Sequence, residues 1–391
     1  MLSKVTTSIC LASALMSGTA IAATSSTSPV AYVYLASSVN NGNEHILGYT
    51  ASADGHLTPI PGSPFYALVQ YLAVNGKYLF ASSAPGLTSQ NPAYLYSYLI
   101  EPNGALKYVG ATNTETNSEN RCNVPYNLDF DHTGSDLYVY ASYVGCTVNP
   151  ENAYQSFSVN KYTGALQDLY TSIPSASVTS PLVISANNKF AYAFQGTGYM
   201  AYGRTPHAYQ RQSGGELMDI AVDLPSPAGD PPNFQGLFHA GAATDASDHM
   251  AVFEIYFLSN GGGANRIATY TINPDTGALS TSSTFTNMPA SLVASNVTMR
   301  FSPSGSLLAV GGSGGLQIFS SNGAAQEKPL TGLIIKNDFI TQLYWDNANH
   351  LYALGVNSGL HVFTVTATGA TEAPGSPYNV QAAISLIVQP K

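Results

Sequence analysis

The sequence predicts an all-β protein: a seven-bladed β-propeller with four-stranded blades, closed by N- and C-terminal strands that share one blade. Three observations predict this fold. A glycine turn recurs seven times along 391 residues, little of the chain follows the helical period, and the two chain ends supply neighbouring strands. The turn glycines are Gly55, Gly104, Gly164, Gly215, Gly277, Gly323 and Gly369. Their spacing fits one blade and its loops per repeat.

The first 22 residues have the pattern of a secretory signal peptide. Lys4 precedes an apolar run from Ile9 to Met16, and Ala20-Ile21-Ala22 forms an A-x-A cleavage site. The run is too short and interrupted for a transmembrane anchor, which needs about 20 apolar residues. We therefore expect residues 1–22 to be removed and residues 23–391 to form a single propeller domain. Export would place the mature chain in the periplasm or outside the cell.

Each repeat contains an apolar strand, a polar turn and a second apolar strand before its glycine turn. The clearest example runs from Val297–Phe301 through Ser302–Gly305 to Ser306–Val310. The glycine turn then connects a third strand to an outer strand, because glycine or asparagine supplies the positive φ of a tight hairpin. We therefore expect inner, second, third and outer strands, in that order, in every blade.

The chain ends explain how the ring closes. Val30–Ala36 matches a second strand of the repeat, and Ala383–Val388 matches an inner strand. Pairing them joins the first and last segments by backbone hydrogen bonds and leaves no open sheet edge. The alternatives, an open array or a pair of sandwiches, explain neither this match nor the seven repeats.

Two cysteines remain after removal of the signal peptide, and export places them in an oxidising compartment. Cys122 precedes the inner strand of the third blade, and Cys146 follows the second strand. Antiparallel strands bring these positions to the same face, so we expect a disulfide between Cys122 and Cys146. Its expected role is to pin two long loops, since nothing in the sequence resembles a redox C-x-x-C site.

The composition limits the partners of the protein. The formal net charge is -9 and charged residues make up 9% of the chain, which argues against nucleic acid because phosphate binding needs clustered lysine and arginine. The 8 histidines are scattered without a ligand motif, so we expect no metal and no cofactor. No segment beyond the signal peptide is suited to span a membrane. We expect a monomer whose partner is a small molecule, a glycan or an envelope protein.

Several segments resemble the lactonase-type seven-bladed propellers, which include 6-phosphogluconolactonases and carboxymuconate lactonising enzymes. The resemblance rests on Phe301–Gly305, the Gly-Ala-Leu turns and Leu57–Phe65, and it covers the whole mature chain. These motifs are specific for the fold and weak for function. The resemblance therefore implies a propeller and, where the catalytic groups are present, hydrolysis of a lactone.

The catalytic groups of that family are mostly missing at the matching positions. The resemblance implies a Pro-His pair at the third inner strand and a Pro-Arg-His stretch at the fourth, followed by carboxylates on the second strands. This sequence has Pro125-Tyr126 and Ser180–Val183 at the first two positions. Tyr140–Ser142 and Phe194–Gly196 stand where the carboxylates are expected. Lactone opening needs a base that activates water and cationic donors that hold the developing oxyanion, and these positions supply neither a base suited to neutral pH nor a cation.

Counting four residues back from the position of Phe301 predicts one turn of the inner wall. Its residues are Ile384, Leu68, Tyr126, Ser180, His239, Val297 and Thr341. Only His239 titrates near neutral pH, so it is the candidate catalytic acid or base. The alternative is a structural, hydrogen-bonding histidine. Tyr126 is a candidate binding residue, since a phenol is a poor base near neutral pH.

The loops on the cysteine-bearing face hold the other candidate binding residues, Glu119, Arg121, Arg204 and Asp230. Two arginines on one face of a chain with few basic residues are suited to an anion or a sugar. Solvated loop charges are the alternative. Prolines around Asp230 stiffen the long loop Leu224–Gln235, which could cover the central opening.

The missing catalytic groups favour a ligand- or partner-binding scaffold as the leading hypothesis for this exported propeller. The alternative is a lactonase that hydrolyses a sugar lactone such as 6-phosphogluconolactone, with His239 as base and Arg121 or Arg204 as the anchor of the substrate. A third hypothesis, a structural repeat module of the envelope, predicts no pocket with convergent polar groups. The side chains that line the central channel separate the three hypotheses.

Overall fold

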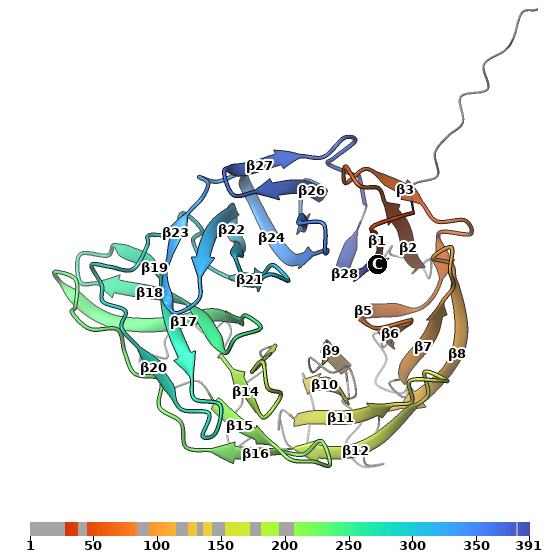
Figure 1. The fold of residues 1–391 in the computed structure, drawn as a ribbon, viewed down its shortest axis with the longest axis horizontal. Coiled ribbons are helices and arrows are strands. Elements are labelled where there is room, and N and C mark those ends of the chain that lie inside the picture. Colours follow the sequence, from red (N-terminus) through yellow and green to blue (C-terminus); the bar gives the residue numbers. More distant parts are fainter. Residues whose placement is uncertain are drawn as a thin grey trace, which may run out of the picture.

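The computed structural model describes residues 28–37, 45–83, 94–114, 124–130, 136–142, 153–172, 181–194, 207–380 and 382–391. All the secondary-structure elements in these residues are β-strands. Their sheets surround a common centre in a propeller-like arrangement (Figure 1). The all-β prediction is therefore confirmed. None of the described residues forms a helix long and apolar enough to cross a bilayer.

One sheet joins the two ends of the chain, as the sequence predicts. It has the order β28-β1-β2-β3, with β4 paired to β2. Its strands are β28 (Ala383–Pro390), β1 (Ala31–Ser37), β2 (His45–Ala51), β3 (Leu57–Pro59) and β4 (Phe65–Tyr66). Antiparallel pairing places Val33 opposite Val388. All seven residues of β1 are buried, so removing either terminal strand would expose core as well as a sheet edge.

Four sheets have four strands each, in the orders β5-β6-β7-β8, β12-β11-β10-β9, β13-β14-β15-β16 and β17-β18-β19-β20. Their strands are β5 (Val69–Asn75), β6 (Tyr78–Ser83), β7 (Tyr94–Ile100), β8 (Leu106–Asn113), β9 (Val124–Phe130), β10 (Asp136–Ser142), β11 (Ala153–Val159), β12 (Leu166–Ser172), β13 (Leu182–Ile184), β14 (Phe190–Ala193), β15 (His207–Arg211), β16 (Leu217–Ile220), β17 (Phe234–Thr244), β18 (His249–Leu258), β19 (Gly263–Ile272) and β20 (Leu279–Thr281). Each follows the predicted sequence of inner, second, third and outer strand.

The last sheet has the order β21-β22-β24-β25-β26-β27, with β23 paired to β22. Its strands are β21 (Thr298–Phe301), β22 (Leu307–Asn322), β23 (Ala325–Pro329), β24 (Ile335–Trp345), β25 (His350–Gly355), β26 (Gly359–Thr366) and β27 (Gly369–Glu372). The long strand β22 pairs with β24 at Ser313↔Phe339. The described sheets therefore differ from seven separate four-stranded blades, because these hydrogen bonds join the strands of two repeats.

One strand of each repeat lies nearest the centre of the ring. These inner strands are β28, β5, β9, β13, β17, β21 and β24, and Figure 1 labels all of them except β13. β28 contacts both β5 and β24, so the strand from the C-terminus closes the inner wall. Residues on these strands are the ones that can converge on a central site.

Three of the recurring glycine turns, at Gly104, Gly164 and Gly277, pack against a tyrosine or phenylalanine of the preceding sheet. Gly104 has a φ of 86°, and a Cβ there would lie 2.9 Å from the ring of Tyr32. Gly277 has a φ of 73°, and its Cβ would lie 2.6 Å from the ring of Phe190. The repeat keeps glycine at these turns because both the backbone conformation and the close approach exclude a side chain.

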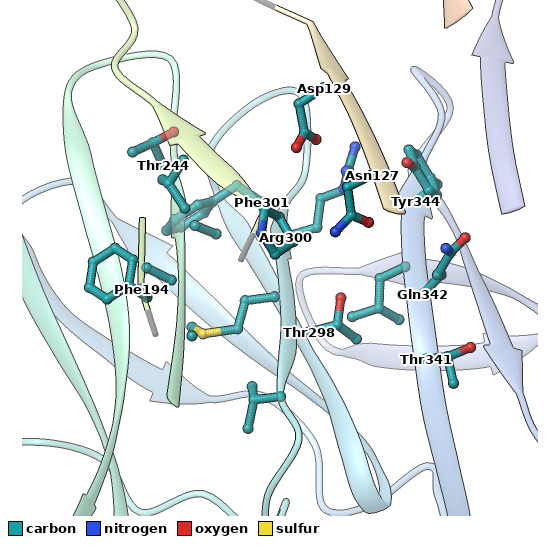
Figure 2. Close-up of a pocket in the computed structure, with 18 of the residues that line it drawn as sticks. Asn127, Asp129, Phe194, Thr244, Thr298, Arg300, Phe301, Thr341, Gln342 and Tyr344 are labelled. Carbon is teal, nitrogen blue, oxygen red and sulfur yellow. The ribbon is translucent and has the colours of Figure 1, made fainter. Parts of the chain in front are cut away.

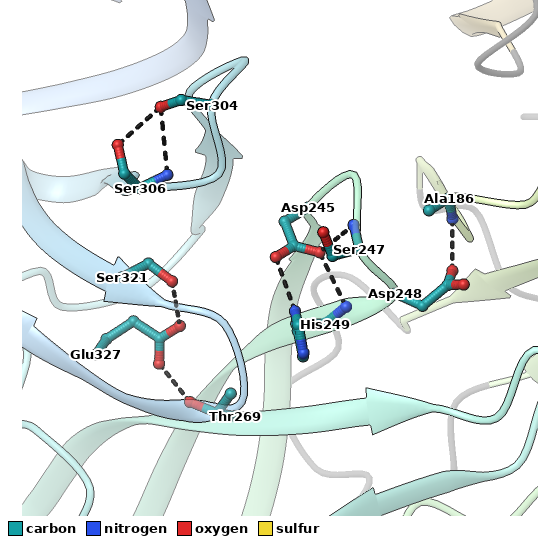
Figure 3. A network of polar contacts seen from close by, with 10 residues as sticks. All are labelled: Ala186, Asp245, Ser247, Asp248, His249, Thr269, Ser304, Ser306, Ser321 and Glu327. Atoms are coloured by element: carbon teal, nitrogen blue, oxygen red, sulfur yellow. Dashed lines mark hydrogen bonds and ion pairs between the residues drawn. The ribbon is translucent and has the colours of Figure 1, made fainter.

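Among the described residues, His249 and His350 belong to hairpin connections between an inner strand and a second strand. His249 Nδ1 lies 2.9 Å from Asp245 Oδ2, and His350 Nδ1 lies 2.7 Å from Asp346 Oδ2. The same aspartates accept hydrogen bonds from the backbone amides of His249 and His350. Figure 3 shows the first of these pairs. These histidines stabilise the hairpin turns that connect the inner strands to the second strands.

A buried carboxyl links two neighbouring sheets. Glu327 on β23 accepts a hydrogen bond from the hydroxyl of Thr269 on β19 (Figure 3). Burial raises the pKa of Glu327 to about 7, although hydrogen bonds from Thr269 and Ser321 oppose the shift. The contact lies between outer and third strands, so it serves packing between sheets.

Candidate functional site

A cavity of about 1750 Å³ lies among the inner strands. Its wall comes mainly from the inner strands β5, β9, β13, β17, β21, β24 and β28, with residues of β18, β19 and adjoining loops. Three ionisable groups with a formal charge at neutral pH, Asp129, Asp245 and Arg300, lie among the described residues of that wall. Asp245 is held by His249 and two backbone amides. Asp129 and Arg300 are therefore the charges to consider for chemistry.

Asp129, Arg300 and Tyr344 occupy the same position on three different inner strands. On each strand the next residue is the last inner residue before the hairpin turn. These last inner residues are Phe130, Phe301 and Trp345, and they pair with Leu137, Leu308 and Leu351 on the second strands. Equal positions in a ring of repeats lie at equal depth. Figure 2 shows the three side chains gathered on one side of the cavity. We call Asp129, Arg300 and Tyr344 the charged layer.

A second set of polar side chains lies two residues earlier on the same strands. Asn127, Thr298 and Gln342 line the cavity there (Figure 2). Residues two apart on a strand point to the same side, so these amides and this hydroxyl adjoin the charged layer. The backbone amide of Leu386 on β28 donates a hydrogen bond to Gln342 Oε1, which fixes that side chain. We call Asn127, Thr298 and Gln342 the amide layer.

Asp129 has an unusual environment for a carboxyl. Its Oδ2 is closed off from solvent and has no hydrogen-bond partner among the described residues. Burial raises the pKa of Asp129 to about 6, while the charge of Arg300 and a hydrogen bond from the backbone of Leu182 lower it. The carboxyl therefore exchanges a proton close to neutral pH, which is the property of a general acid or base.

Arg300 is held in place through its neighbour strand. Its guanidinium carbon lies 3.9 Å from the centre of the Tyr344 ring, and Trp345 Nε1 donates a hydrogen bond of 3.0 Å to the Arg300 carbonyl. The side chain is nevertheless exposed in the cavity. A guanidinium stacked on a ring keeps its charge and its planar set of donors. Arg300 can therefore present hydrogen bonds to an anion in the cavity.

Tyr344 contributes a neutral hydroxyl to the charged layer. Burial raises the pKa of Tyr344, and the charge of Asp129 adds to that rise while Arg300 opposes it. A phenol with a raised pKa stays protonated near neutral pH. The layer thus combines a carboxyl that titrates, a fixed cation and a hydroxyl donor within one wall of the cavity.

Most loop residues predicted from the sequence fall outside the described residues. This applies to Glu119, Arg121, Arg204, Cys122 and Cys146, so the disulfide and the arginine site stay predictions. The backbone of Tyr126 is described as part of β9, and its side chain is not. Asp230 is exposed in the loop between β16 and β17. It does not line the cavity.

His239 lies apart from the cavity wall. Its Nδ1 is 2.6 Å from Glu254 Oε2, and Glu254 is completely buried. Thr244 is the last inner residue of β17, and the register shifts between His239 and Gly241. The cavity residue four positions before Thr244 is therefore Ala240. The structure thus brings His239 together with Glu254 and Tyr270, and not with the charged layer.

The sequence contains a signal for the charged layer that strand counting missed. Asp129 and Arg300 are the charged residues within Tyr126–Phe130 and Val297–Phe301, the two inner-strand segments that define the repeat. A charge within an apolar strand is costly unless it is paired or functional. The resemblance implies carboxylates on the second strands, so Asp129 on an inner strand was not among the predicted site residues.

Among the solved structures with a similar fold, some carry lactonase names and others do not. A periplasmic gluconolactonase from Pseudomonas aeruginosa is 15% identical, with a TM-score of 0.58 over 92% of this chain and 99% of that one. A putative 6-phosphogluconolactonase from Bacteroides uniformis is 14% identical, with a TM-score of 0.63 over 93% of this chain and 100% of that one. A protein from Lactobacillus plantarum is 13% identical, with a TM-score of 0.63 over 92% of this chain and 99% of that one.

These similarities define the class of fold. The chain has the fold of the lactonase-like β-propellers, so the resemblance inferred from its motifs is confirmed at that level. The sequence matches no family model and no curated protein. Identities of 13 to 15% establish architecture, and chemistry must be argued from the site.

Proposed function

We propose that the protein hydrolyses a sugar lactone in its central cavity, with the charged layer as the active site. The observation that carries this proposal is Asp129: a carboxyl with a pKa raised to about 6 and an unpartnered oxygen, next to the exposed guanidinium of Arg300. The amide layer offers hydrogen bonds to the hydroxyl groups of a sugar. Two solved structures of this fold are named as a gluconolactonase and a putative 6-phosphogluconolactonase, and these names support the proposal of a sugar lactone as substrate.

Asp129 acts first as a general base. Its carboxylate takes a proton from a water molecule as the water oxygen bonds to the lactone carbonyl carbon. The carbonyl π electrons move onto the carbonyl oxygen, which becomes an oxyanion. An electron pair of the oxyanion then re-forms the carbonyl double bond as the bond between that carbon and the ring oxygen breaks, and the protonated Asp129 returns its proton to the ring oxygen. The products of this step are one carboxylic acid and one hydroxyl group on the opened sugar.

Arg300 and Tyr344 stabilise the charge that develops during attack. The guanidinium is a fixed cation with several N–H donors, which is the arrangement that favours an oxyanion over a neutral carbonyl. The phenol of Tyr344 adds a hydroxyl donor on the same side. Because the cation–π stacking and the Trp345 hydrogen bond hold Arg300, little reorganisation is needed when the charge forms.

The architecture and location of this enzyme extend the proposal. We assign seven blades, with the seven-stranded sheet counted as two, because β21, β22 and β23 form one repeat and β24 to β27 form the next. We also propose that residues 1–22 are a cleaved signal peptide, that Cys122 and Cys146 form a disulfide, and that residues 23–391 act in the periplasm or outside the cell. The periplasmic location in the name of the Pseudomonas aeruginosa protein agrees with export.

The test is hydrolysis of D-glucono-δ-lactone and its 6-phosphate by the purified mature chain. Proton release is followed between pH 5.5 and pH 7.5, with the spontaneous rate subtracted. We expect turnover by the wild type and a loss of about 10²-fold or more in kcat for Asp129→Asn, because that substitution removes the base. Asp223→Asn, the same change at an exposed loop carboxylate, is the matched control.

The competing proposal, a binding scaffold without catalysis, predicts a different result in the same experiment. Titration calorimetry would then detect binding of the lactone or of gluconate, while proton release stayed at the spontaneous rate. Wild-type turnover that Asp129→Asn leaves unchanged would also reject the active site proposed here.

A further inference from the structure

The mouth of the cavity carries exposed phenylalanine side chains. Phe257 is 37% exposed and Phe339 is 36% exposed, and both line the cavity together with Phe238. Large apolar side chains with this exposure cost free energy in water. They are a sign of a surface that contacts a ligand when they adjoin a concave site. We call Phe238, Phe257 and Phe339 the aromatic rim.

The aromatic rim stands in line with the charged layer on the same strands. Phe339 precedes Trp345 on β24 by six residues, and Phe238 precedes Thr244 on β17 by six, so both occupy one depth. Phe257 on β18 pairs with Gly236, two residues before Phe238, so it lies on the same face and about two residues farther from the charged layer. At about 3.3 Å per residue, the rim lies roughly 10 Å from Gln342 along the strand.

The arc of wall between β9 and β21 is mainly apolar above its hairpin end. β13 contributes Leu182 and Val183, and β17 contributes Ala240 and Ala242, with Thr244 and Asp245 at the hairpin end of β17. Figure 2 shows Phe194 on the side of that arc, and the labelled side chains of the charged and amide layers lie away from it. The cavity therefore has a polar side at depth and an apolar path from there to the mouth.

The cavity is also large for an unsubstituted sugar lactone. Its volume of about 1750 Å³ exceeds the roughly 300 to 1,000 Å³ of sites that enclose one small ligand. The six side chains of the two polar layers account for recognition of the lactone ring and its hydroxyls. The apolar path and the aromatic rim remain for another part of the same substrate.

We propose that the substrate is a sugar lactone with an alkyl or aryl substituent, which occupies the aromatic rim while the lactone ring lies at the charged layer. This inference rests on the proposed function and adds a specificity site to it. Phe257 and Phe339 act as specificity residues, because their exposed rings become buried against the substituent. Binding of that group raises kcat/KM through desolvation of apolar surface.

The experiment compares 6-O-methyl, 6-O-butyl and 6-O-octyl ethers of D-glucono-δ-lactone, whose ether bond is inert to lactone hydrolysis. Each methylene that becomes buried is worth at most about a fourfold gain in kcat/KM. We expect kcat/KM for the octyl ether to exceed that for the methyl ether by on the order of 10²-fold, which corresponds to about four buried methylenes. Phe257→Ser and Phe339→Ser should each reduce this ratio about tenfold.

Phe234→Ser is the matched control. Phe234 is as exposed as Phe257 and lies on β17, yet it is outside the cavity wall. Its substitution should keep the wild-type ratio of the two ethers. Circular dichroism and melting temperature check that each variant is folded.

The outcomes separate the two levels of the proposal. Turnover of all three ethers at one kcat/KM would overturn the aromatic specificity site and leave lactone hydrolysis standing. Failure to turn over any lactone would overturn the proposed function itself. A concentration-dependent molecular mass in light scattering, abolished by Phe257→Ser or Phe339→Ser, would assign the rim to contact between copies of this chain and reject the substrate substituent.

Discussion

The glycine turns offer a quantitative test of how the sheets lock together. Gly277 combines a φ of 73° with a Cβ position 2.6 Å from the Phe190 ring. Gly76 has a φ of 57° and no atom within 4 Å of its Cβ position. Gly214 has open space around its Cβ position as well, and it is not among the described glycines with positive φ. Alanine at these three sites therefore separates strain from steric overlap.

The expected losses of unfolding free energy follow from the two causes. Gly76→Ala should cost about 1–2 kcal/mol, the penalty of a side chain in the left-handed region. Gly277→Ala should cost about 2–5 kcal/mol, since overpacking against Phe190 adds about 1–3 kcal/mol. Gly214→Ala should stay within about 0.5 kcal/mol of the wild type.

Urea denaturation followed by circular dichroism measures the three differences on the purified mature chain. Equal m-values among the variants would show that the midpoints report stability. An equal loss for Gly277→Ala and Gly76→Ala would refute the reasoning that glycine is required at this turn by its close approach to the preceding sheet. A loss for Gly214→Ala as large as for Gly277→Ala would refute it too.

Three further predictions concern the charged layer and His239. Asp129→Asn should raise the free energy of unfolding at pH 7.5 by up to about 3 kcal/mol. The pKa of Asp129 in the native state is about 6, above its ordinary value, so the native wild type loses stability as pH rises from about 4 to about 6, and asparagine removes this loss. Melting curves at pH 4 and pH 7.5 test this, and an equal difference at both would contradict it. Arg300→Gln should lower kcat about 10²–10³-fold, and Arg300→Lys should lower it less because the charge remains; equal rates for the two variants would argue against a role for the charge. His239→Gln should cost about 1–3 kcal/mol of stability through the buried Glu254 while kcat changes less than twofold, and a loss of turnover would restore His239 as the candidate base.

The fold was largely predictable because the repeat is local. Gly277 and its counterparts mark hairpins that each need only neighbouring residues, and the closing strands at Ala31–Ser37 and Ala383–Pro390 lie within two residues of the predicted ranges. The division into sheets was less predictable. The pairing of β22 with β24 at Ser313↔Phe339 depends on how two repeats meet, which no local pattern records.

The site was less predictable because it is assembled from distant strands. Asp129, Arg300 and Tyr344 meet only after the ring closes, and each looks ordinary within its own strand. His239 illustrates the sensitivity to register. The last inner residue of β17 is Thr244, so counting four residues back selects Ala240, whereas counting from Ala243 selects His239. Because side chains alternate along a strand, this one-residue slip exchanges the two faces.

The central claim is that Asp129 works as a base with a pKa near neutral pH, tuned by Arg300. The measurement that tests it most directly is the pH dependence of kcat/KM for lactone hydrolysis between pH 4.5 and pH 7.5. We predict a rise with a midpoint at about 6, absent from Asp129→Asn and moved to higher pH in Arg300→Gln, because the positive charge of Arg300 lowers the pKa of Asp129. A wild-type profile that both variants reproduce would contradict the claim.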